Sequence, residues 1–341
     1  MLDYELLKKL CTADGISGDE ERVRNIIIEE ITPYADKITV DNMGNVLVFK
    51  KGKQTPKQKL LISAHMDEVG FIVTDILDNG CIKFASVGGI NDSAAFAKQV
   101  KIGKNGLSGV VNAQPIHVLK ADERKKNPKI DSLQIDIGAK DKEDAKKYVS
   151  LGDSIVFDAP YENKNGRIIS KAIDDRFGCL VLIEMIKTEL LYDMYFSFVV
   201  QEEIGLRGAK AAAFTIAPDS AIVVEATTAA DLPSAENEKK VCCVGGGAVV
   251  SLMDRATIYD KQYCRLAFEA AEEQGVKVQT KTMIAGGNDA GAIHSSRGGV
   301  RTVAVSVPCR YLHASSSLIA VEDAEAVYAV VKATAEKILS R

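Results

Sequence analysis

Apolar segments that end abruptly in acidic residues or histidine recur along this chain. The first begins at Leu60 with LLISA and stops at His65, which Met66, Asp67 and Glu68 follow. A continuous apolar run is typical of a strand buried on both faces of a sheet. Ligand sites in open α/β sheets gather beyond the carboxyl ends of strands. The pattern therefore predicts that His65 binds a metal ion and that Asp67 orients it, although a hydrogen-bonded structural histidine is the alternative.

Helix and strand patterns alternate on both sides of this segment. Before it we expect helices at 2–13 and 19–34, with Ser17 as a helix cap, and a hairpin over 38–49. After residue 171 the pattern predicts helices at 175–190, 258–274, 289–296 and 321–340, and strands at 194–200, 221–225, 240–250, 277–284 and 301–307.

The stretch from 70 to 163 has a different pattern of apolar and turn residues. Short strands alternate there with turn residues, and the only helical pattern covers 142–148, which is typical of a small all-β module. We therefore predict an α/β fold in which a catalytic domain, residues 1–69 and 164–341, is interrupted by a β-rich insert at 70–163. The charged run at 120–129 is expected to form a loop at the edge of the insert.

Composition narrows the class of protein. The chain has 341 residues, of which 46% are hydrophobic and 26% charged, and this is typical of a globular protein of two domains. A formal net charge of −4 gives no basis for nucleic-acid or membrane-surface binding. No apolar run is long enough to span a membrane. Seven scattered cysteines without a CxxC pair indicate reduced thiols in a cytoplasmic protein.

Further polar clusters punctuate the predicted catalytic domain. They are Asp174 and Asp175 at a helix start, and Glu202-Glu203, Glu225 and Tyr311 with His313 after apolar strands. Each cluster alone is explained by a helix cap or a loop. The shared position of His65, Glu202-Glu203, Glu225 and His313 at strand ends is not explained in this way. Two adjacent carboxylates beyond a buried strand are also costly unless they are paired or bound to metal.

Two histidines and several carboxylates form a ligand set suited to zinc, cobalt or manganese. The carboxylates outnumber the needs of one tetrahedral ion, which points to two metal ions with a bridging aspartate and a hydrolytic reaction. One carboxylate should then remain free as the general base. A glycosidase with two acids is the competing interpretation, but that chemistry has no use for two histidines at the same edge.

The motifs SAHMDEVGF, SKAIDDRFG, VVQEEIGLRGA, GGNDAGAIH and RYLHASSS occur in this order. Together they resemble the tetrahedral aminopeptidases, cytosolic dinuclear metallopeptidases of which some carry endoglucanase annotations. The resemblance implies a zinc-peptidase-like α/β domain with a β-barrel-like insert that mediates dimerisation, and dimers that assemble into a dodecamer. It also implies two divalent metal ions, Zn, Co or Mn, in each subunit.

The resemblance assigns a role to each matching position. His65 and Glu225 would hold one metal ion, Glu203 and His313 the other, and Asp174 would bridge them. Glu202 would be the general base and Asp67 would orient His65. Asp175 matches no ligand position and is expected to stabilise the loop or to pair with Arg176. The segment that contains Asn288 and Asp289 is expected to line the pocket without binding metal.

We therefore expect a cytosolic aminopeptidase that removes the first residue from short peptides. Glu225 stands where the family often has aspartate, and in related peptidases glutamate there goes with carboxypeptidases and deacylases. A dinuclear deacylase or carboxypeptidase is thus one alternative, and a non-catalytic metal-binding scaffold is another. His117 and His294 are expected to be a surface or interface residue and a structural residue, respectively.

Overall fold

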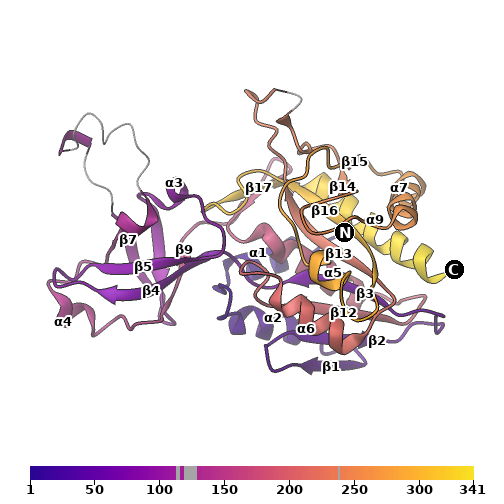
Figure 1. Cartoon of the computed structure of the whole chain (residues 1–341), viewed down its shortest axis with the longest axis horizontal. Coiled ribbons are helices and arrows are strands. Elements are labelled where there is room, and N and C mark those ends of the chain that lie inside the picture. Colours follow the sequence, from indigo (N-terminus) through magenta and orange to yellow (C-terminus); the bar gives the residue numbers. More distant parts are fainter. Residues whose placement is uncertain (113–115, 119–128, 237–238) are drawn as a thin grey trace.

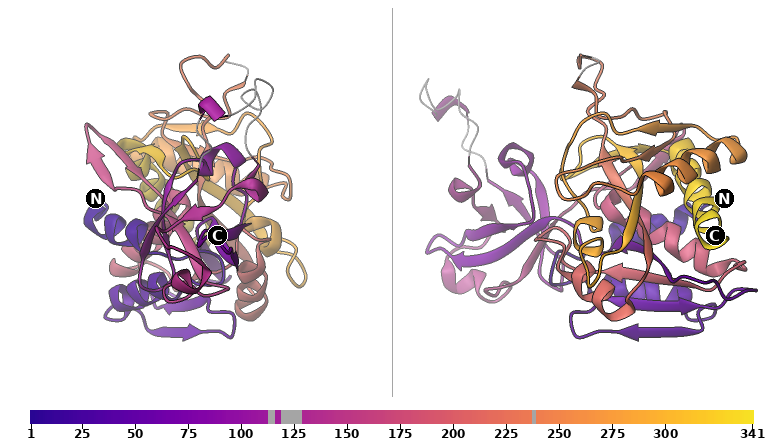
Figure 2. Two further views of the ribbon diagram at one scale, coloured as in Figure 1. Left: turned by 90° about the vertical axis from the view of Figure 1, so that its left-hand side faces the viewer. Right: turned by 45° about the vertical axis from the view of Figure 1, so that its right-hand side comes forward.

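The computed structural model describes residues 1–112, 116–118, 129–236 and 239–341. The molecule has a larger part, built from helices and a broad sheet, and a smaller part made mainly of strands that extends from one end of it (Figure 1). Both termini lie on the larger part, and the two further views show the same arrangement (Figure 2). The expected loop at 120–129 falls outside the described residues except for Lys129.

A mixed central sheet forms the larger part, in agreement with the zinc-peptidase-like α/β domain that the resemblance implied. Its eight strands in the described residues follow the order β1 (Lys37–Val40), β2 (Val46–Lys50), β12 (Met194–Val199), β3 (Leu60–His65), β13 (Ser220–Thr228), β16 (Arg301–Cys309), β14 (Ala248–Val250) and β15 (Val278–Thr280). Strands β12, β3, β13 and β16 are parallel neighbours, whereas β2 and β14 run antiparallel to the strands beside them in this group. The carboxyl ends of the four parallel strands therefore share one edge.

Helices flank this sheet. They are α1 (Tyr4–Thr12), α2 (Glu21–Ile31), α5 (Ile173–Lys187), α6 (Arg207–Ile216), α7 (Lys261–Gln274), α8 (Ala290–Ile293) and α9 (Val321–Leu339). Helix α5 packs on β3 and β13 and is covered in turn by α1, α2 and α9. Its residues are buried nearly all round, which explains why its sequence is apolar rather than amphipathic. All six residues of β3 are buried as well.

The smaller part is a closed barrel of antiparallel strands. Around the barrel the order is β4 (Gly70–Ile76), β5 (Ile82–Val87), β8 (Ile135–Asp136), β7 (Leu107–Val111), β6 (Gln99–Ile102) and β9 (Ser154–Phe157). Short helices α3 (Asp92–Ala95) and α4 (Lys142–Ala145) and the 3₁₀ turns Ile116–Val118 and Ile130–Ser132 connect them. Phe71 packs edge-on against Phe84 and Phe157, with ring centroids 4.9 and 5.4 Å apart, and these rings fill the centre.

Several predicted elements differ from the structure. The strand expected over 240–250 is reduced to β14, because Gly245 and Gly247 adopt positive φ angles and their amides bind the carboxylate of Asp323. Helix α6 was not predicted. The strands β10 (Glu162–Lys164), β11 (Arg167–Ser170) and β17 (Ser317–Ala320) were not predicted either, and they form a small separate sheet. None of the helices in the described ranges combines the length and apolar character needed to cross a membrane.

Candidate metal centre

The shared edge of the four parallel strands gathers the predicted site residues. His65 ends β3, Glu202 and Glu203 follow β12, and His313 follows β16. Glu225 lies inside β13 rather than at its end as predicted. Strand β13 stays paired with β16 as far as Thr228, beyond the point where its pairing with β3 stops, so the Glu225 side chain still projects at the carboxyl edge of β3.

Asp174 lies between the two histidines. Its Oδ1 is 3.3 Å from Nε2 of His65, and its Oδ2 is 3.3 Å from Nε2 of His313. Glu225 Oε2 is 3.8 Å from the His65 ring nitrogen, and Glu203 Oε1 is 3.3 Å from that of His313. One aspartate thus faces two histidine–glutamate pairs, one with each carboxylate oxygen.

The donor set fits two metal ions. His65, Asp174 and Glu225 place ligand atoms within 4.8 Å of one another, and so do Asp174, Glu203 and His313. Asp174 is common to both groups, which suits a bridging ligand. Asp174 Oδ1 and Glu225 Oε1 are buried without a hydrogen-bond partner, a costly arrangement that a bound cation would relieve. Glu202 could also group with His65 and Glu203, so its position permits ligation as well as proton transfer.

The two adjacent aspartates at the start of α5 have separate roles. The backbone at Asp174 and Asp175 is not helical, although the helix is assigned from Ile173. Asp175 Oδ1 accepts a hydrogen bond from the amide of Gly178 at 2.9 Å, so Asp175 caps the regular helix while Asp174 faces the histidines. The expected stabilising role of Asp175 is therefore present. The alternative pairing with Arg176 is wrong, because that guanidinium pairs with Glu68.

Asp67 organises two turns at once. Its backbone carbonyl lies 3.0 Å from Nδ1 of His65, whereas its carboxylate is 3.5 Å from that nitrogen. The carboxylate instead accepts hydrogen bonds from the backbone amides of Glu202 and Glu203, at 3.0 and 3.1 Å, and from the Ser17 hydroxyl at 2.6 Å. Ser17 is thus not the helix cap that the sequence predicted, and sequence analysis missed its place beside the centre.

The segment that follows β5 of the barrel contributes a hydrogen bond to the centre. Nδ1 of His313 lies 2.9 Å from the backbone carbonyl of Gly89, in the segment after β5. Hydrogen bonding of the second ring nitrogen fixes the orientation of a metal-binding histidine. Sequence analysis missed this residue, because a backbone carbonyl leaves no signal in the side-chain pattern.

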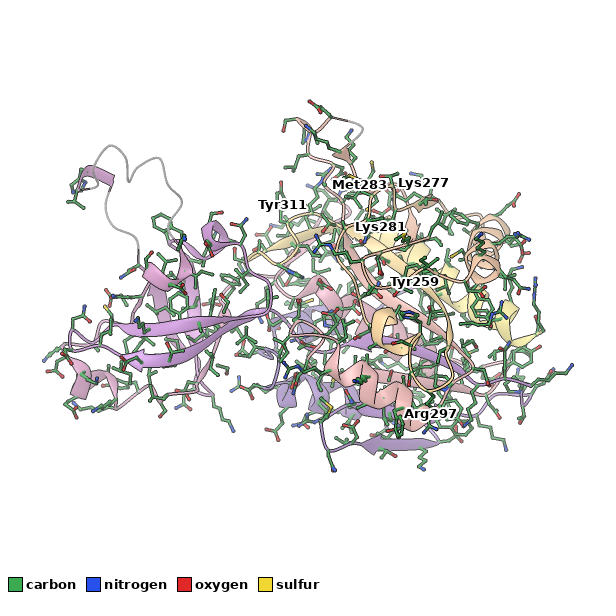
Figure 3. All side chains as sticks on the ribbon, in the orientation of Figure 1. Tyr259, Lys277, Lys281, Met283, Arg297 and Tyr311 are labelled. Carbon is green, nitrogen blue, oxygen red and sulfur yellow. The ribbon has the colours of Figure 1, made fainter. Side chains whose placement is uncertain are left out.

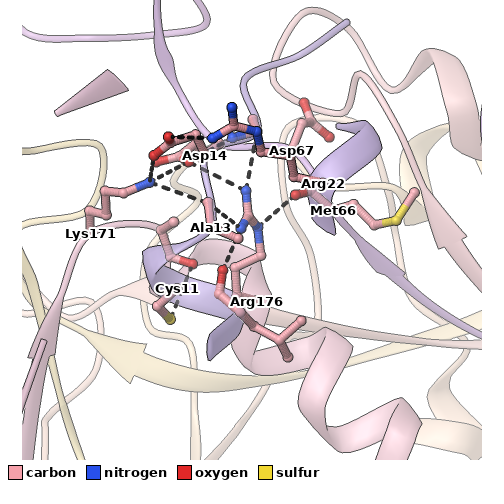
Figure 4. A network of polar contacts seen from close by, with 12 residues as sticks. Cys11, Ala13, Asp14, Arg22, Met66, Asp67, Lys171 and Arg176 are labelled. Atoms are coloured by element: carbon pink, nitrogen blue, oxygen red, sulfur yellow. Dashed lines mark hydrogen bonds and ion pairs between the residues drawn. The ribbon is translucent and has the colours of Figure 1, made fainter. Parts of the chain in front are cut away.

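A buried cationic network supports the turn that follows β3. Arg176 is fully buried, and its guanidinium donates to the backbone carbonyls of Met66, Leu10, Ala13 and Gly15 (Figure 4). Glu68 Oε1 lies 3.4 Å from this guanidinium and 2.6 Å from Nζ of Lys171. These contacts tie the end of α1 to the peptide between His65 and Asp67.

In the protein without metal, the local electrostatics favour protonated forms of Glu203 and of the histidines, while hydrogen bonds to both histidines hold the pKa of Asp174 below its usual value despite burial. Burial raises the pKa of Glu202 to about 7 and that of Glu203 to about 8, and the negative charge of Asp174 acts in the same direction. Although burial opposes it, hydrogen bonding to Asp174 and the charge of Glu203 raise the pKa of His313 to about 9. Perturbed groups concentrated in one cleft are typical of a functional site.

The other polar residues considered in the sequence lie away from the proposed ligand positions. His117 is exposed in the barrel part, and His294 places Nδ1 2.8 Å from the carbonyl of Ala290, in line with the expected structural role. Asn288 lines the cavity beside the centre, while Asp289 is fully buried. Among the described residues neither His294 nor Asp289 belongs to a group of potential metal ligands.

Comparison with known proteins decides the family. A family model described as M42 glutamyl aminopeptidase matches residues 44–330. The chain belongs to the M42 aminopeptidase family. An M42 relative from Acetivibrio thermocellus that carries an aminopeptidase name is 39% identical over 322 residues, 94% of each chain. The lysyl aminopeptidase of Pyrococcus furiosus is 30% identical and covers 99% of this chain and 98% of its own.

Solved structures share the M42 fold from end to end. The TET aminopeptidase of Thaumarchaeota archaeon SCGC AB-539-E09 superposes with a TM-score of 0.92 and 35% identity, covering 99% of this chain and 96% of its own. The TET1 peptidase of Pyrococcus horikoshii, described as assembling into a tetrahedron or a large octahedral shell, gives 0.86 and 35% over 97% and 98%. The resemblance inferred from the motifs is therefore confirmed, and the chain is an M42 aminopeptidase.

Proposed function

We propose that this aminopeptidase uses two divalent metal ions to remove the first residue from short peptides. The observation that carries the proposal is the position of Asp174, whose two carboxylate oxygens each lie 3.3 Å from a different histidine. In this proposal His65 and Glu225 hold one ion, Glu203 and His313 hold the other, and Asp174 bridges them. Zinc, cobalt and manganese all suit these nitrogen and oxygen ligands.

The reaction needs a proton acceptor that the metal ions leave free. The bound ions would polarise the scissile carbonyl and acidify a water molecule. Glu202 lies at the same edge, and Asp67 fixes its backbone amide. Glu202 then takes a proton from the attacking water and returns it to the leaving amine. Burial raises the pKa of Glu202 to about 7 in the protein without metal, and nearby metal cations would favour the ionised form that accepts a proton.

The glutamate at position 225 favours a second candidate function, that of a deacylase or carboxypeptidase. In the resemblance described above, glutamate at this position goes with deacylases and carboxypeptidases, which act on substrates with a blocked amine or a free carboxyl end. The Glu225 side chain reaches His65, so ligation alone does not separate the two functions. The glycosidase interpretation has less support, because two histidines converge on Asp174, where sugar hydrolysis would need a pair of acids.

Assembly and location form part of the same proposal. The TET1 relative assembles into closed shells, and dimers on the six edges of a tetrahedron give a dodecamer. We assign dimer contacts to the insert at 70–163, where Val110, Tyr148 and Leu151 are exposed at 49%, 60% and 65%. The seven cysteines are all free, which supports a cytoplasmic setting.

Activity on a substrate panel tests the proposed reaction. Free and N-acetylated aminoacyl anilides and dipeptides are incubated with the protein before chelation, after chelation, and after each metal ion is restored singly. We expect hydrolysis of free-amine substrates that stops on chelation and returns with metal. Hydrolysis confined to N-acetylated substrates would favour the deacylase, and activity that survives chelation would contradict the two-metal mechanism.

A further inference from the structure

A cavity of about 210 Å³ opens beside the metal centre. His65, Asp174 and Glu225 line its inner end, and its outer wall includes Lys281 and the segment 285–288. The cavity is smaller than the pockets of roughly 300–1,000 Å³ that hold drug-sized ligands. A peptide whose first carbonyl lies at the centre can therefore place one side chain in this cavity.

The ammonium group of Lys281 is only partly engaged in hydrogen bonds. Its Nζ donates to the backbone carbonyl of Ala285 at 2.6 Å, and it forms no ion pair within the described residues. The side chain, which is labelled in Figure 3, is half-buried. Asp254 is the buried acid whose charge acts most strongly on Lys281. Its carboxylate oxygens already accept hydrogen bonds from the amide of Thr257 and the hydroxyl of Tyr259. At least one N–H of Lys281 thus remains available to a ligand.

The cation is also held in place. The amide of Arg255 donates to the carbonyl of Gly286 at 3.0 Å, and the Asn288 side chain donates to the Tyr259 hydroxyl at 3.0 Å. These contacts fix the segment whose Ala285 carbonyl receives the Lys281 ammonium. A cation that is already positioned loses little conformational entropy when a ligand binds.

The charge of the cavity depends on Lys281 once metal is bound. Asp174, Glu202, Glu203 and Glu225 together carry four negative charges, which two divalent ions balance. The other residues that line this cavity are uncharged apart from the histidines and Lys281. Lys281 therefore places a cationic group on the outer wall of the loaded cavity, and the negative charge of Asp254 acts on it from outside this lining.

We infer that Lys281 makes this enzyme selective for peptides that begin with aspartate or glutamate, whose side-chain carboxylate binds its ammonium in the cavity. This inference rests on the proposed aminopeptidase function. Membership of the family does not decide the matter, because the family model is described as glutamyl while the Pyrococcus furiosus relative is a lysyl aminopeptidase. The available N–H of Lys281 and its place on the outer wall of the cavity favour an acidic side chain in this enzyme.

Binding of L-glutamate and L-glutamine tests the inference without turnover. The two ligands have the same shape and differ in side-chain charge. Calorimetry on the zinc-loaded protein should show glutamate binding roughly 10- to 100-fold more tightly, the range that a charge-assisted hydrogen bond supplies. Lys281→Met should remove this difference and Lys281→Arg should retain part of it. Equal affinity of the unaltered protein for both ligands would overturn the inference, whatever the catalytic activity.

Lys277→Met is the matched control. Lys277 precedes β15 as Lys281 follows it, but its ammonium lies outside the cavity, 3.1 Å from the carbonyl of Gly245 and 3.8 Å from Glu322 (Figure 3). Lys277→Met removes the same charge at the opposite end of β15. Lys277→Met should therefore bind glutamate as the unaltered protein does. A loss of glutamate selectivity as large as that of Lys281→Met would show a general charge effect and overturn the assignment to Lys281.

Hydrolysis of anilides separates this inference from the proposed reaction. Glutamyl, glutaminyl, leucyl and lysyl anilides have no terminal carboxyl group, so a Lys281 effect on them reports the side chain. We expect kcat/KM to be highest for the glutamyl anilide and to fall roughly 10- to 100-fold in Lys281→Met, with the leucyl anilide little changed. A leucyl or lysyl preference would overturn the inference and leave the aminopeptidase intact. Failure to hydrolyse any free-amine substrate would overturn the proposed function. The glutamate-binding measurement would still test whether Lys281 binds a carboxylate in the cavity.

Discussion

The carboxylate of Asp67 accepts a hydrogen bond from the backbone amide of Glu202 at 3.0 Å. The turn that follows β3 and the turn that follows β12 are thereby fixed to each other. Strand pairing between β3 and β12 ends earlier in both chain segments, where Val199 pairs with His65. The Asp67 side chain therefore helps to fix the position of the proposed base relative to the proposed ligand His65.

Replacing Asp67 by Asn should lower activity with little loss of fold. The side-chain NH2 group of the new asparagine would face the backbone N–H of either Glu202 or Glu203. That N–H would lose the carboxylate oxygen that accepts its hydrogen bond in the unaltered protein. We expect kcat to fall roughly 10- to 100-fold, the usual cost of losing a partner behind a metal ligand. Kinetics and metal analysis at matched protein concentration measure this. Ser17→Ala, which removes only the 2.6 Å hydroxyl contact, should have a smaller effect, and an equal loss in both would contradict this account.

Replacing Glu202 by Gln should remove the proton acceptor while leaving the metal ions in place. We expect kcat to fall by about 10²- to 10⁴-fold, the usual contribution of a general base. Metal content should equal that of Glu29→Gln, a control on the exposed surface of α2. Near-normal turnover would show that another group is the base. Loss of a metal ion would show instead that Glu202 is a ligand, as its grouping with His65 and Glu203 permits.

Metal binding should strengthen as pH rises. The pKa of Glu203 is raised to about 8 by burial, and that of His313 to about 9, where hydrogen bonding to Asp174 overcomes burial. Both groups must lose a proton before they bind metal, so each bound ion displaces protons. The same raised pKa values stabilise the metal-free fold at low pH, and this stabilisation is lost as pH rises through them. The metal-induced increase in Tm should therefore grow between about pH 6 and pH 9. Thermal unfolding with and without zinc measures it, and a constant increase would contradict the assignment of these ligands.

Replacing Arg176 by Met should destabilise the whole catalytic part. Four backbone carbonyls and Glu68 would lose a buried donor, and breaking a buried pair costs roughly 3–5 kcal/mol. Arg22→Met is the control, because Arg22 pairs with Asp14 near the same network but is about half exposed, where a pair contributes roughly 0–1 kcal/mol. Urea unfolding compares the two variants. Similar midpoints would show that the Arg176 network contributes no more than a surface ion pair.

The order of the elements and the placement of the centre could be predicted from sequence because both follow from strand burial. The strands β3, β12, β13 and β16 are continuous apolar runs, and their parallel pairing brings His65, Glu203, Glu225 and His313 to one edge. The periodicity of the N-terminal and C-terminal helices was equally informative, since these helices have one face in solvent.

The supporting contacts could not be predicted, because they depend on the backbone and on distant residues. Ser17 was interpreted as a cap from its local neighbours, whereas its hydroxyl binds Asp67, fifty positions away in the chain. The carbonyl of Gly89 approaches His313 across the boundary between barrel and catalytic part. Lys281 resembles any other lysine at a strand end until its cavity is formed. Helix α6 was missed because RGAKAAAF offers mostly alanine as an apolar signal.

The barrel separates strands that must meet. His65 pairs with Val199, about 130 residues later, so closing this loop in an unfolded chain is slow and entropically costly. In the barrel, however, Phe71 of β4 pairs with Ile155 of β9, which brings the two ends of the insert together. Once the barrel has folded, the remaining loop is less than half as long, which lowers its closure cost by about 1 kcal/mol. The central sheet should thus form fastest on chains whose barrel is already complete, so the two parts of this protein fold in a defined order.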